Sequence, residues 1–353
     1  MPLSDPANQA DSRAIARAAF LEAAGHGNTI LTALPADASF RRYYRLAGAN
    51  PPLLLMDAPP PKEDVRPFVR IGRHLAGLGL SAPAIHQVDE AEGFALIEDF
   101  GDDTYRRLLE SGAAEEPLFT AATDVLVLLH AHPQGAAVEA PPFDIRKFLE
   151  EISELPDWYG LAVTGRPLPA ESRDRFVEAW EELLETMPPS ENGLVLLDYH
   201  VDNLMRVAGR TGAAACGILD FQDARIGPKA YDLLCLLRNE RRGIDAALSE
   251  RLYEHYIRAC PPVDRESFGA WYRVLTAQRY TKVVGRFARL TLRDSRDGYL
   301  KYLPRVLRLL DDALRDPLLG AVRQRLDAIL PDWQLSPPDN PAALRQRVAS
   351  ARG

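Results

Sequence analysis

The stretch that decides the fold runs from Gly193 to Leu237 and reads GLVLLDYHVDNLMRVAGRTGAAACGILDFQDARIGPKAYDLLCLL. It contains two short apolar runs, at 194–197 and 216–219, and both have the composition of buried strands. Each run ends directly at an aspartate, Asp198 or Asp220, and Asn203 follows shortly after Asp198. Strands that deliver polar side chains to short loops predict a chemical site aimed by a rigid sheet.

These three side chains carry the oxygen groups that a phosphoryl-transfer centre uses. In such centres one aspartate faces the attacking hydroxyl, while an asparagine and a second aspartate hold Mg²⁺ on the nucleotide phosphates. Mg²⁺ prefers carboxylate, amide and phosphate oxygens in an octahedron. A single Asp-x-x-x-x-Asn is common in turns and helix caps, so the prediction depends on two strand–aspartate units in this order. We therefore predict Asp198 as the catalytic base and Asn203 and Asp220 as the metal ligands.

Three motifs in this stretch resemble those of the aminoglycoside phosphotransferase and choline kinase-like superfamily. They are Asp-Tyr-His-Val-Asp-Asn at 198–203, Ile-Leu-Asp-Phe at 218–221 and Gly-Pro-x-x-Tyr-Asp-Leu at 227–233. The resemblance implies an α+β, bilobal, protein-kinase-like fold with a small antiparallel-sheet lobe and a larger, mainly helical lobe. It also implies an enzyme that uses ATP to phosphorylate small molecules. The family usually has His-Gly before the first aspartate, whereas Leu196 and Leu197 stand here, so any role of that histidine is absent or performed elsewhere.

The composition limits the classes of protein. A chain of 353 residues with 46% apolar content can bury a large core, and its length suggests about two lobes. The formal net charge of −8 argues against a general binder of nucleic acid or anionic membranes. No apolar run approaches the ~20 residues of a membrane helix, and the N-terminal sequence lacks the pattern of a signal peptide. Cys216, Cys235 and Cys260 show no Cys-x-x-Cys spacing, which indicates buried thiols in a reducing cytoplasm.

Residues 1–100 have the pattern of a small nucleotide-binding lobe. A helix is predicted at 6–24, followed by strands at 29–34 and 43–46, and the loop between these strands would lie over the nucleotide phosphates. Kinases usually have glycines in this loop so that main-chain N–H groups can approach the phosphates, but this loop has none. Ser39, Arg41 and Arg42 could contact the phosphates instead. The alternative is an ordinary surface hairpin with solvated arginines.

The third predicted strand, at 52–57, lacks a residue that kinases normally use. A lysine on this strand usually grips the α- and β-phosphates, whereas Met56 and Asp57 occupy the region here. Lys62, or one of the two arginines in the preceding loop, could supply the cation. The missing lysine also favours a nucleotide-binding pseudokinase that acts as a regulator, although such a protein would have no chemical need for the retained metal ligands.

A helix at 65–78 and strands at 85–88 and 94–97 lead into a predicted hinge. An adenine ring would pair there with main-chain groups of Glu98, Asp99 and Phe100. Gly101 marks the boundary with a C-terminal catalytic and substrate-binding lobe, residues 101–353. We expect that lobe to be mainly helical, with helices at 118–130, 143–159, 173–187, 244–260, 268–290, 299–310 and 318–330 and a short one near the C-terminus.

Three polar residues of this lobe are assigned supporting roles. His130, at the end of the helix 118–130, is more often a packed or capping group than a catalytic one. Asp232 is expected to stabilise the loop that holds Asp198, either through its backbone or through His200.

Further segments resemble one branch of the superfamily, the anomeric kinases of N-acetylmuramate and N-acetylglucosamine that serve bacterial peptidoglycan recycling towards UDP-N-acetylmuramate. The segments are ASFRRYYR at 38–45, LMDAPP at 55–60, IEDFG at 97–101, AQR at 277–279 and GRFARL at 285–290. That branch has Met-Asp-Ala-Pro where other members carry the lysine, which weakens the pseudokinase hypothesis. The resemblance implies that ATP and the amino sugar give the α-1-phosphate. A third hypothesis, an antibiotic-modifying phosphotransferase, changes only the acceptor.

The resemblance leaves the contacts to the sugar open. The lactyl carboxylate of N-acetylmuramate requires a cation, for which Arg279 and Arg286 are the candidates. Glu151 and Trp158 could face the sugar ring. A positively charged series on a helix is otherwise usually a solvated face. The predicted partners are therefore ATP, Mg²⁺ and an amino sugar, with no role for nucleic acid or membrane.

Overall fold

The computed structural model describes residues 6–35, 39–260, 264–334 and 340–350. The chain divides into two compact units, the first comprising Met1–Pro141 with Leu196–Arg225 and the second Pro142–Val195 with Ile226–Gly353. These units are drawn differently from the predicted lobes, because the segment after residue 195 returns to the first unit through bridges such as Ser81 to Gly217. The lobe boundary at residue 100 stays a prediction.

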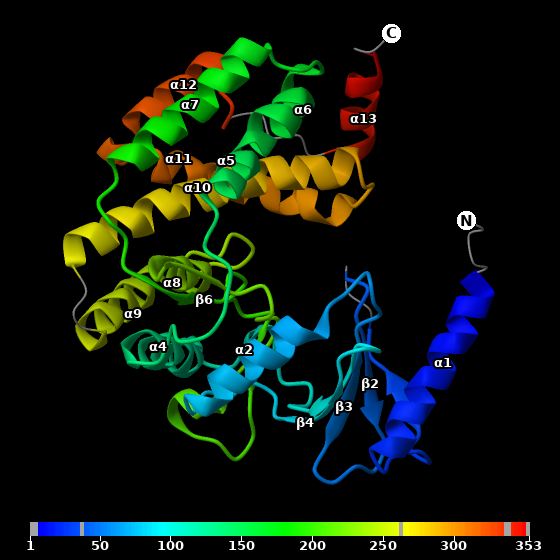
Figure 1. Cartoon of the computed structure of the whole chain (residues 1–353). Helices are drawn as coiled ribbons and strands as arrows, with labels where there is room; N and C mark the ends of the chain where they lie inside the picture. Colours follow the sequence, from blue (N-terminus) through cyan, green and yellow to red (C-terminus); the bar gives the residue numbers. More distant parts are fainter. Residues whose placement is uncertain (1–5, 36–38, 261–263, 335–339, 351–353) are drawn as a thin grey trace. The chain divides into compact units, whose positions relative to one another are not determined.

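A five-stranded antiparallel sheet, in the order β1-β2-β3-β5-β4, organises the first unit (Figure 1). Its strands are β1 (Leu31–Ala33), β2 (Arg42–Leu46), β3 (Leu53–Asp57), β4 (Ile85–Asp89) and β5 (Phe94–Glu98). The prediction of an antiparallel sheet in this part of the chain is confirmed. Residues 36–38 of the predicted phosphate loop lie outside the described residues.

Helix α1 (Pro6–Ala23) packs against one face of this sheet and lies alongside β2 and β3 in Figure 1. Its buried Phe20 and Leu21 join a core with Leu55 of β3 and with Phe94 and Leu96 of β5. Burial of such large apolar side chains stabilises each by roughly 1.5–3 kcal/mol, which fixes this helix on the sheet.

The last residue of β3, Asp57, pairs with two arginines of α1. Asp57 is 4% exposed and accepts hydrogen bonds from Nε and Nη2 of Arg13 at 2.8 and 2.6 Å. Arg17 Nη1 lies 3.4 Å from the other carboxylate oxygen. Because side chains alternate along a strand, Met56 lies on the opposite face of the sheet, where it pairs with Tyr43 of β2. Asp57 therefore anchors α1 and does not face the same side as Met56.

The first unit also contains three helices and a short hairpin. They are α2 (Val65–Gly77), α3 (Tyr105–Glu110), α4 (Glu115–Ala131), β7 (Leu204–Arg206) and β8 (Cys216–Ile218), with the 3₁₀ turn η2 (Gly212–Ala215) before β8. The helices predicted at 65–78 and 118–130 are confirmed as α2 and α4. His130 is buried in the last turn of α4, as expected for a packed or capping residue.

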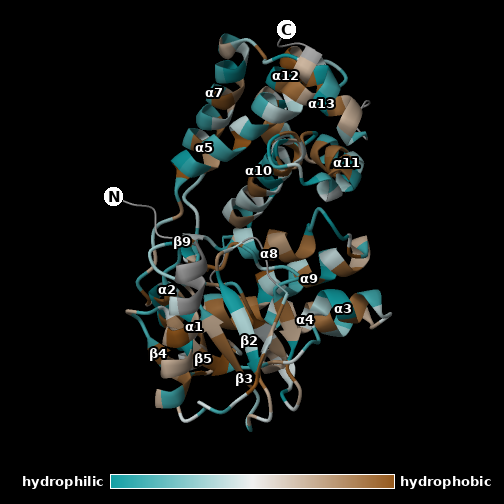
Figure 2. Ribbon diagram, turned by 90° about the vertical axis from the view of Figure 1, so that its right-hand side faces the viewer, coloured by the Kyte–Doolittle hydropathy of each residue, from teal (hydrophilic) through white to brown (hydrophobic). Residues whose placement is uncertain are grey.

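The described part of the second unit is almost entirely helical, as predicted, apart from the strand pair β6 (Asn192–Val195) and β9 (Arg225–Pro228). Figure 2 shows both hydrophobic and hydrophilic residues on α7 and α10. Helix α7 buries one face, whereas α10 is buried over most of its surface. The helical elements are α5 (Ile145–Glu154), the π-helical turn η1 (Leu155–Gly160), α6 (Leu161–Thr164), α7 (Ala170–Thr186), α8 (Ala230–Leu237), α9 (Ala246–Ala259), α10 (Arg265–Leu292), η3 (Asp297–Tyr302), α11 (Leu303–Ala313), η4 (Pro317–Leu319), α12 (Gly320–Ile329) and α13 (Pro341–Ser350).

Helix α10 is the longest element, with 28 residues, and packs against α5, η1, α8 and α11. Gly285 permits its closest approach, since a Cβ there would lie only 2.1 Å from the main-chain carbonyl carbon of Glu154. At this same point the predicted helix 143–159 divides into α5 and the π-helical turn.

The three cysteines are buried thiols that form no disulfide, as predicted. Burial raises the pKa of the Cys216 thiol to about 11, which keeps it protonated. Within the described ranges, none of the helices has the combined length and hydropathy of a membrane-spanning segment.

Candidate active site

The hairpin β7–β8 brings together the two predicted metal ligands. Its register pairs Leu204 with Ile218, and the main-chain N–H of Leu219 donates to the carbonyl of Asn203 at 2.9 Å. Asn203 comes immediately before β7, and Asp220 is the second residue after β8, so both side chains start from the same end of the hairpin.

Main-chain hydrogen bonds fold residues 198–203 into a tight loop. The Asp198 carbonyl accepts from the N–H of His200 and from Nδ2 of Asn203, each at 3.0 Å. The N–H of Asn203 donates to the His200 carbonyl at 2.8 Å. Because the amide nitrogen of Asn203 faces a carbonyl, its Oδ1 points away from that bond and can act as an acceptor. The Asp198 side chain is exposed and thus accessible to a substrate.

Two residues of this site have left-handed backbone conformations that non-glycine residues rarely adopt. Leu197 has φ of 70° and Asp220 has φ of 58°. Such a conformation costs roughly 1–2 kcal/mol and is often found where the fold aims a functional side chain. It also explains why β6 ends at Val195 and does not extend through the predicted run 194–197, since a strand cannot continue through positive φ.

The surroundings of Asp220 fit a hard cation. Its Oδ1 accepts a hydrogen bond from Nε2 of Gln222 at 2.9 Å, and Arg41 Nη2 lies 3.7 Å from the same oxygen. The carboxylate remains 44% exposed. With the Asn203 amide oxygen at the same end of the hairpin, these oxygens are the ligand types that Mg²⁺ takes together with phosphate oxygens.

The residues predicted to contact the phosphates differ in the contacts that they make within the protein. Ser39 Oγ accepts from the N–H of Arg41 at 3.3 Å. Arg42 Nη1 donates to the carbonyls of Ser39 and Arg41 at 2.9 and 2.8 Å, so Arg42 stabilises its own loop. Lys62 Nζ lies 4.6 Å from the centre of the Phe40 ring.

The side chains of the predicted hinge are engaged in contacts within the protein. Glu98 pairs with Arg210, whose guanidinium also lies 5.4 Å from the centre of the Phe100 ring. Asp99 accepts hydrogen bonds from Nε and Nη2 of Arg45 at 2.5 and 3.2 Å. The main-chain N–H groups of Glu98 and Asp99 are engaged as well, donating to the carbonyls of Ala84 and Pro52 at 2.8 and 3.0 Å, and the adenine contact at this segment stays a prediction. Sequence reasoning missed Arg45 and Arg210, because their partners are far away in the chain.

The two residues predicted to support the site, His200 and Asp232, belong to different units of the fold. His200 is buried, and its Nδ1 lies 3.5 Å from Oδ2 of Asp202. The other oxygen of Asp202, Oδ1, accepts a hydrogen bond from Nη1 of Arg106 at 2.9 Å. Asp232 is fully buried in the first turn of α8 and belongs to the second unit, whereas His200 belongs to the first. Its support of the catalytic loop stays a prediction.

Arg279, a candidate for the sugar carboxylate, is 6% exposed and already has an anionic partner. Its Nε donates to Oε2 of Glu240 at 3.0 Å, and its Nη1 contacts Sγ of Cys235 at 3.2 Å. Burial raises the pKa of Glu240, but the charge and hydrogen bond of Arg279, a backbone hydrogen bond and the charge of Arg241 together bring that pKa below its usual value. A buried, matched pair of this kind is costly to break, which favours a structural role for Arg279.

Arg286 has a different environment, because it shares its partner. Its Nε and Nη2 donate to the two oxygens of Glu154 at 2.7 and 2.8 Å, and Arg289 Nη1 donates to the same carboxylate at 2.9 Å. One carboxylate thus faces two guanidinium groups. Burial and the charge of Arg286 lower the pKa of Arg289, consistent with an excess of positive charge.

Glu151 and Trp158, the two residues predicted to face the sugar ring, lie close to Glu154 in the sequence. Glu151 Oε1 forms an ion pair with Nζ of Lys282 at 2.8 Å. Trp158 is half-buried in η1. Neither has a contact that identifies a sugar, so both remain predictions.

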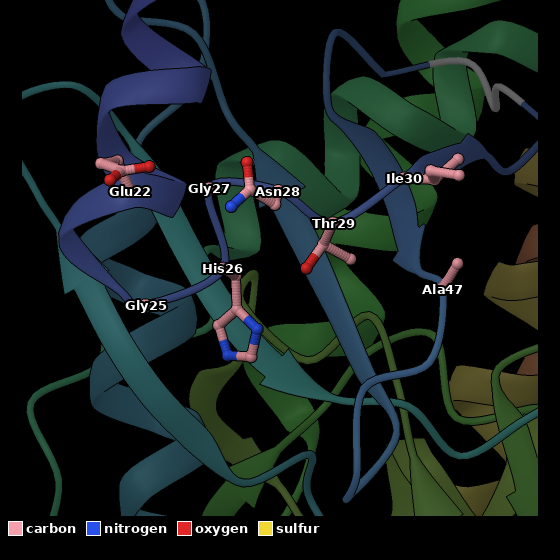
Figure 3. Close-up of a pocket in the computed structure, with 8 residues that line it drawn as sticks. All are labelled: Glu22, Gly25, His26, Gly27, Asn28, Thr29, Ile30 and Ala47. Atoms are coloured by element: carbon pink, nitrogen blue, oxygen red, sulfur yellow. The ribbon is translucent and has the colours of Figure 1, made fainter.

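A pocket of about 410 Å³ lies at the C-terminal end of α1 (Figure 3). The side chains of Glu22, His26, Asn28 and Thr29 line it. None of the predicted nucleotide or metal contacts is among its lining residues, so we assign it no part in the candidate site.

The sequence matches the model of the phosphotransferase enzyme family over residues 30–271. It is 32% identical to an N-acetylmuramate/N-acetylglucosamine kinase of Caulobacter vibrioides, covering 90% of this chain and 97% of the relative. It is 35% identical to a protein of the same name from Pseudomonas aeruginosa, covering 83% of this chain and 86% of the relative.

Solved structures show the same fold at low sequence identity. A choline/ethanolamine kinase family protein from Mesorhizobium loti superposes with a TM-score of 0.60 at 18% identity, covering 90% of this chain and 99% of that one. An aminoglycoside phosphotransferase superposes with a TM-score of 0.55 at 14% identity, covering 86% and 99%. The predicted protein-kinase-like α+β fold is confirmed.

Proposed function

The chain belongs to the phosphotransferase enzyme family, and we propose that it transfers the γ-phosphoryl group of ATP to the anomeric C1 hydroxyl of N-acetylmuramate and N-acetylglucosamine, giving the α-1-phosphate. The observation that carries this proposal is the similarity, over most of both chains, to relatives named for these two sugars. The anomeric position and a place in peptidoglycan recycling in the cytoplasm come from the family resemblance of segments such as the Met-Asp-Ala-Pro run at 56–59.

In this proposal Asp198 orients the sugar and accepts the C1 hydroxyl proton. As the sugar oxygen forms its bond to the γ-phosphorus, the bond from that phosphorus to the bridging oxygen breaks, and ADP leaves with the electron pair. Because the transition state is loose, positioning and charge neutralisation supply most of the rate. A hemiacetal hydroxyl is more acidic than an ordinary alcohol, so one exposed carboxylate is a sufficient base.

Asn203 and Asp220 are the proposed ligands of Mg²⁺. When bound, the ion would neutralise charge on the phosphate oxygens. The protein's own contribution is to hold these two side chains at one end of the β7–β8 hairpin, through its register and the hydrogen bond from Leu219.

The nucleotide is proposed to lie along the first unit. Its phosphates would contact the segment containing Ser39, Arg41 and Arg42, and its adenine would pair with main-chain groups between Glu98 and Phe100. The hinge side chains pair with Arg45 and Arg210, and the N–H groups of Glu98 and Asp99 donate to carbonyls of the protein, so the main-chain carbonyls of this segment are the groups proposed to face the adenine.

For the sugar, we favour Arg286 over Arg279 as the partner of the lactyl carboxylate. Arg279 is fully matched by Glu240, whereas Arg286 and Arg289 share Glu154 and have one cation in excess. Glu151 and Trp158 remain candidates for the sugar ring.

The experiment is to measure ADP release by the purified protein with a set of acceptors. N-acetylmuramate and N-acetylglucosamine should both support turnover. The methyl glycoside of N-acetylglucosamine, which lacks a free C1 hydroxyl, is the matched control and should not. Turnover with the methyl glycoside, or with an aminoglycoside alone, would contradict the proposal.

A further inference from the structure

Three charged residues of the first unit, Glu63, Arg41 and Asp220, form a chain of ion pairs. Glu63 lies just before α2, Arg41 lies in the loop before β2, and Asp220 belongs to the predicted metal site. Arg41 Nε lies 3.4 Å from Oε2 of Glu63, and Arg41 Nη2 lies 3.7 Å from Oδ1 of Asp220. The Arg41 side chain is only 13% exposed and that of Glu63 only 17%. Glu63 immediately precedes Asp64, the residue that caps α2.

Both ion-pair distances are longer than the 2.7–3.2 Å typical of N–H···O hydrogen bonds. Within the described residues, Arg41 Nε is buried and makes no hydrogen bond. A guanidinium has five N–H donors and no acceptor, so Arg41 retains donors for a stronger anionic acceptor. Phosphate oxygens match that geometry, since arginine can bind them with two parallel hydrogen bonds.

The other two candidate cations are occupied elsewhere. Arg42 is exposed and donates to carbonyls of its own loop, and Lys62 is exposed and lies over the Phe40 ring. Of the three candidates, Arg41 is the one paired with Asp220.

The face of the sheet supports the same assignment. Tyr43, two residues after Arg41, pairs across strands with Met56, which occupies the region where kinases carry the lysine. Burial raises the pKa of the Tyr43 hydroxyl, Arg41 lowers it, and the carboxylates of Asp220 and Glu63 raise it further. These charges are therefore gathered on the Met56 face of the sheet.

We propose that Glu63 positions Arg41 as the cation that grips the nucleotide phosphates. In protein kinases a lysine on the third strand does this and is held by a glutamate of the following helix. Here the cation comes from the loop before β2, and the glutamate from the turn just before α2. Arg41 would touch the phosphates, and Glu63 would act only through Arg41. This inference rests on the use of ATP in the proposed function.

Glu63 is well placed for this role because main-chain groups hold both its backbone and its carboxylate. Its N–H donates to the carbonyl of Pro59 at 3.1 Å, and its Oε1 accepts from the N–H of Phe40 at 2.9 Å. The second bond ties the loop before β2 to the entry of α2. A Glu63→Gln substitution keeps an oxygen acceptor for Phe40 and removes only the charge.

The test is calorimetric titration of Arg41→Ala, Glu63→Gln and the double variant with three probes: Mg·ATP, ATP in excess chelator, and adenosine. Arg41→Ala should raise the Kd for both forms of ATP by about 10- to 100-fold, the range for hydrogen bonds to a charged group, and leave adenosine unchanged. Glu63→Gln should raise both ATP values less. In the Arg41→Ala background it should have no further effect, because its effect passes through Arg41.

Lys62→Ala and Arg42→Ala are the cation controls. Lys62→Ala should bind ATP like the wild type, and Arg42→Ala, which removes the hydrogen bonds that Arg42 donates within its own loop, should weaken ATP binding less than Arg41→Ala does. Arg41→Lys should recover part of the affinity, because it keeps the charge. A larger loss in either control, or a Glu63→Gln effect that persists without Arg41, would overturn the inference and leave the proposed function untouched. Absence of ATP binding by the wild-type chain would contradict the proposed function itself.

Discussion

Asp198 and Asp220 are proposed to touch different partners, so substitutions at the two positions should have different effects. Asp198→Asn keeps the size of the side chain and removes the base. It should lower kcat by at least about 100-fold, the low end for loss of a general base, with the affinity for Mg·ATP nearly unchanged. Steady-state kinetics and calorimetry measure the two quantities. Asp223→Asn, at an exposed aspartate of the same unit, is the control and should keep its activity; wild-type turnover in Asp198→Asn would refute the assignment.

Asp220→Ala should show an effect that depends on the metal. With Mg²⁺ present, ATP should bind at least about 10-fold more weakly, because a charged ligand of the ion is lost. In excess chelator the same variant should bind ATP as well as the wild type or better, since the substitution removes a carboxylate near the phosphates and frees Arg41 from its ion pair. An equal loss of ATP affinity with Mg²⁺ and with chelator would show that Asp220 is not a ligand of the metal.

Arg286 should distinguish the two sugars. Arg286→Ala should raise KM for N-acetylmuramate by about 10-fold or more, the loss expected for a charged hydrogen bond, and leave KM for N-acetylglucosamine unchanged, because only N-acetylmuramate has the lactyl carboxylate. Arg293→Ala, at the end of the same helix and paired with Asp294, is the control. A parallel change for both sugars would indicate that Arg286 serves only the packing of Glu154.

The candidate catalytic residues could be predicted from the sequence because their spacing is local. Asp198, Asn203 and Asp220 follow strands within one stretch, and the pairing of β7 with β8 is enough to bring the metal ligands together. The partner of Arg41 could not be predicted in this way. Glu63 lies in a different turn, and only the tertiary fold selects it from the many acidic residues of the chain. The burial of Arg279 against Glu240 was missed for the same reason.

At the scale of elements, Gly285 should be indispensable to the packing of α10. Gly285→Ala would force a Cβ to within 2.1 Å of the main chain of Glu154, and overpacking of this kind typically costs about 1–3 kcal/mol. Thermal or denaturant unfolding measures the loss. Gly320→Ala in the same unit is the control, because a Cβ there meets nothing within 4 Å. Equal stability of the two variants would contradict the close approach.

Helix α2 was predicted because its apolar residues recur with the helical period, whereas α10 is buried over most of its surface and its prediction did not depend on that pattern. Three short helices were not predicted, and one of them, α6, has only 4 residues. Helix α3 has 6 residues, too few to show a period, and all 8 residues of α8 are buried, so no polar face marks it as a helix. The helix predicted at 143–159 includes the π-helical turn η1, which begins directly after Glu154, where Gly285 of α10 comes closest.

For the whole molecule, the antiparallel sheet and the helical remainder followed from the order of apolar patterns, and the family motifs supplied the kinase-like fold. The sequence does not encode in any motif which sugar is bound, because recognition depends on side chains that converge only after folding. The choice of amino sugar therefore depends on relatives that share about a third of their residues with this chain.

Phosphorus NMR of the product tests the central claim most directly. The wild-type protein would be supplied with ATP, Mg²⁺ and N-acetylmuramate or N-acetylglucosamine, and the coupling of the new phosphorus signal to the sugar protons would identify the phosphorylated oxygen. The proposed function predicts a phosphate on the C1 oxygen of both sugars, in the α configuration. A phosphate on the 6-hydroxyl, or no sugar phosphate while an aminoglycoside is phosphorylated, would contradict it.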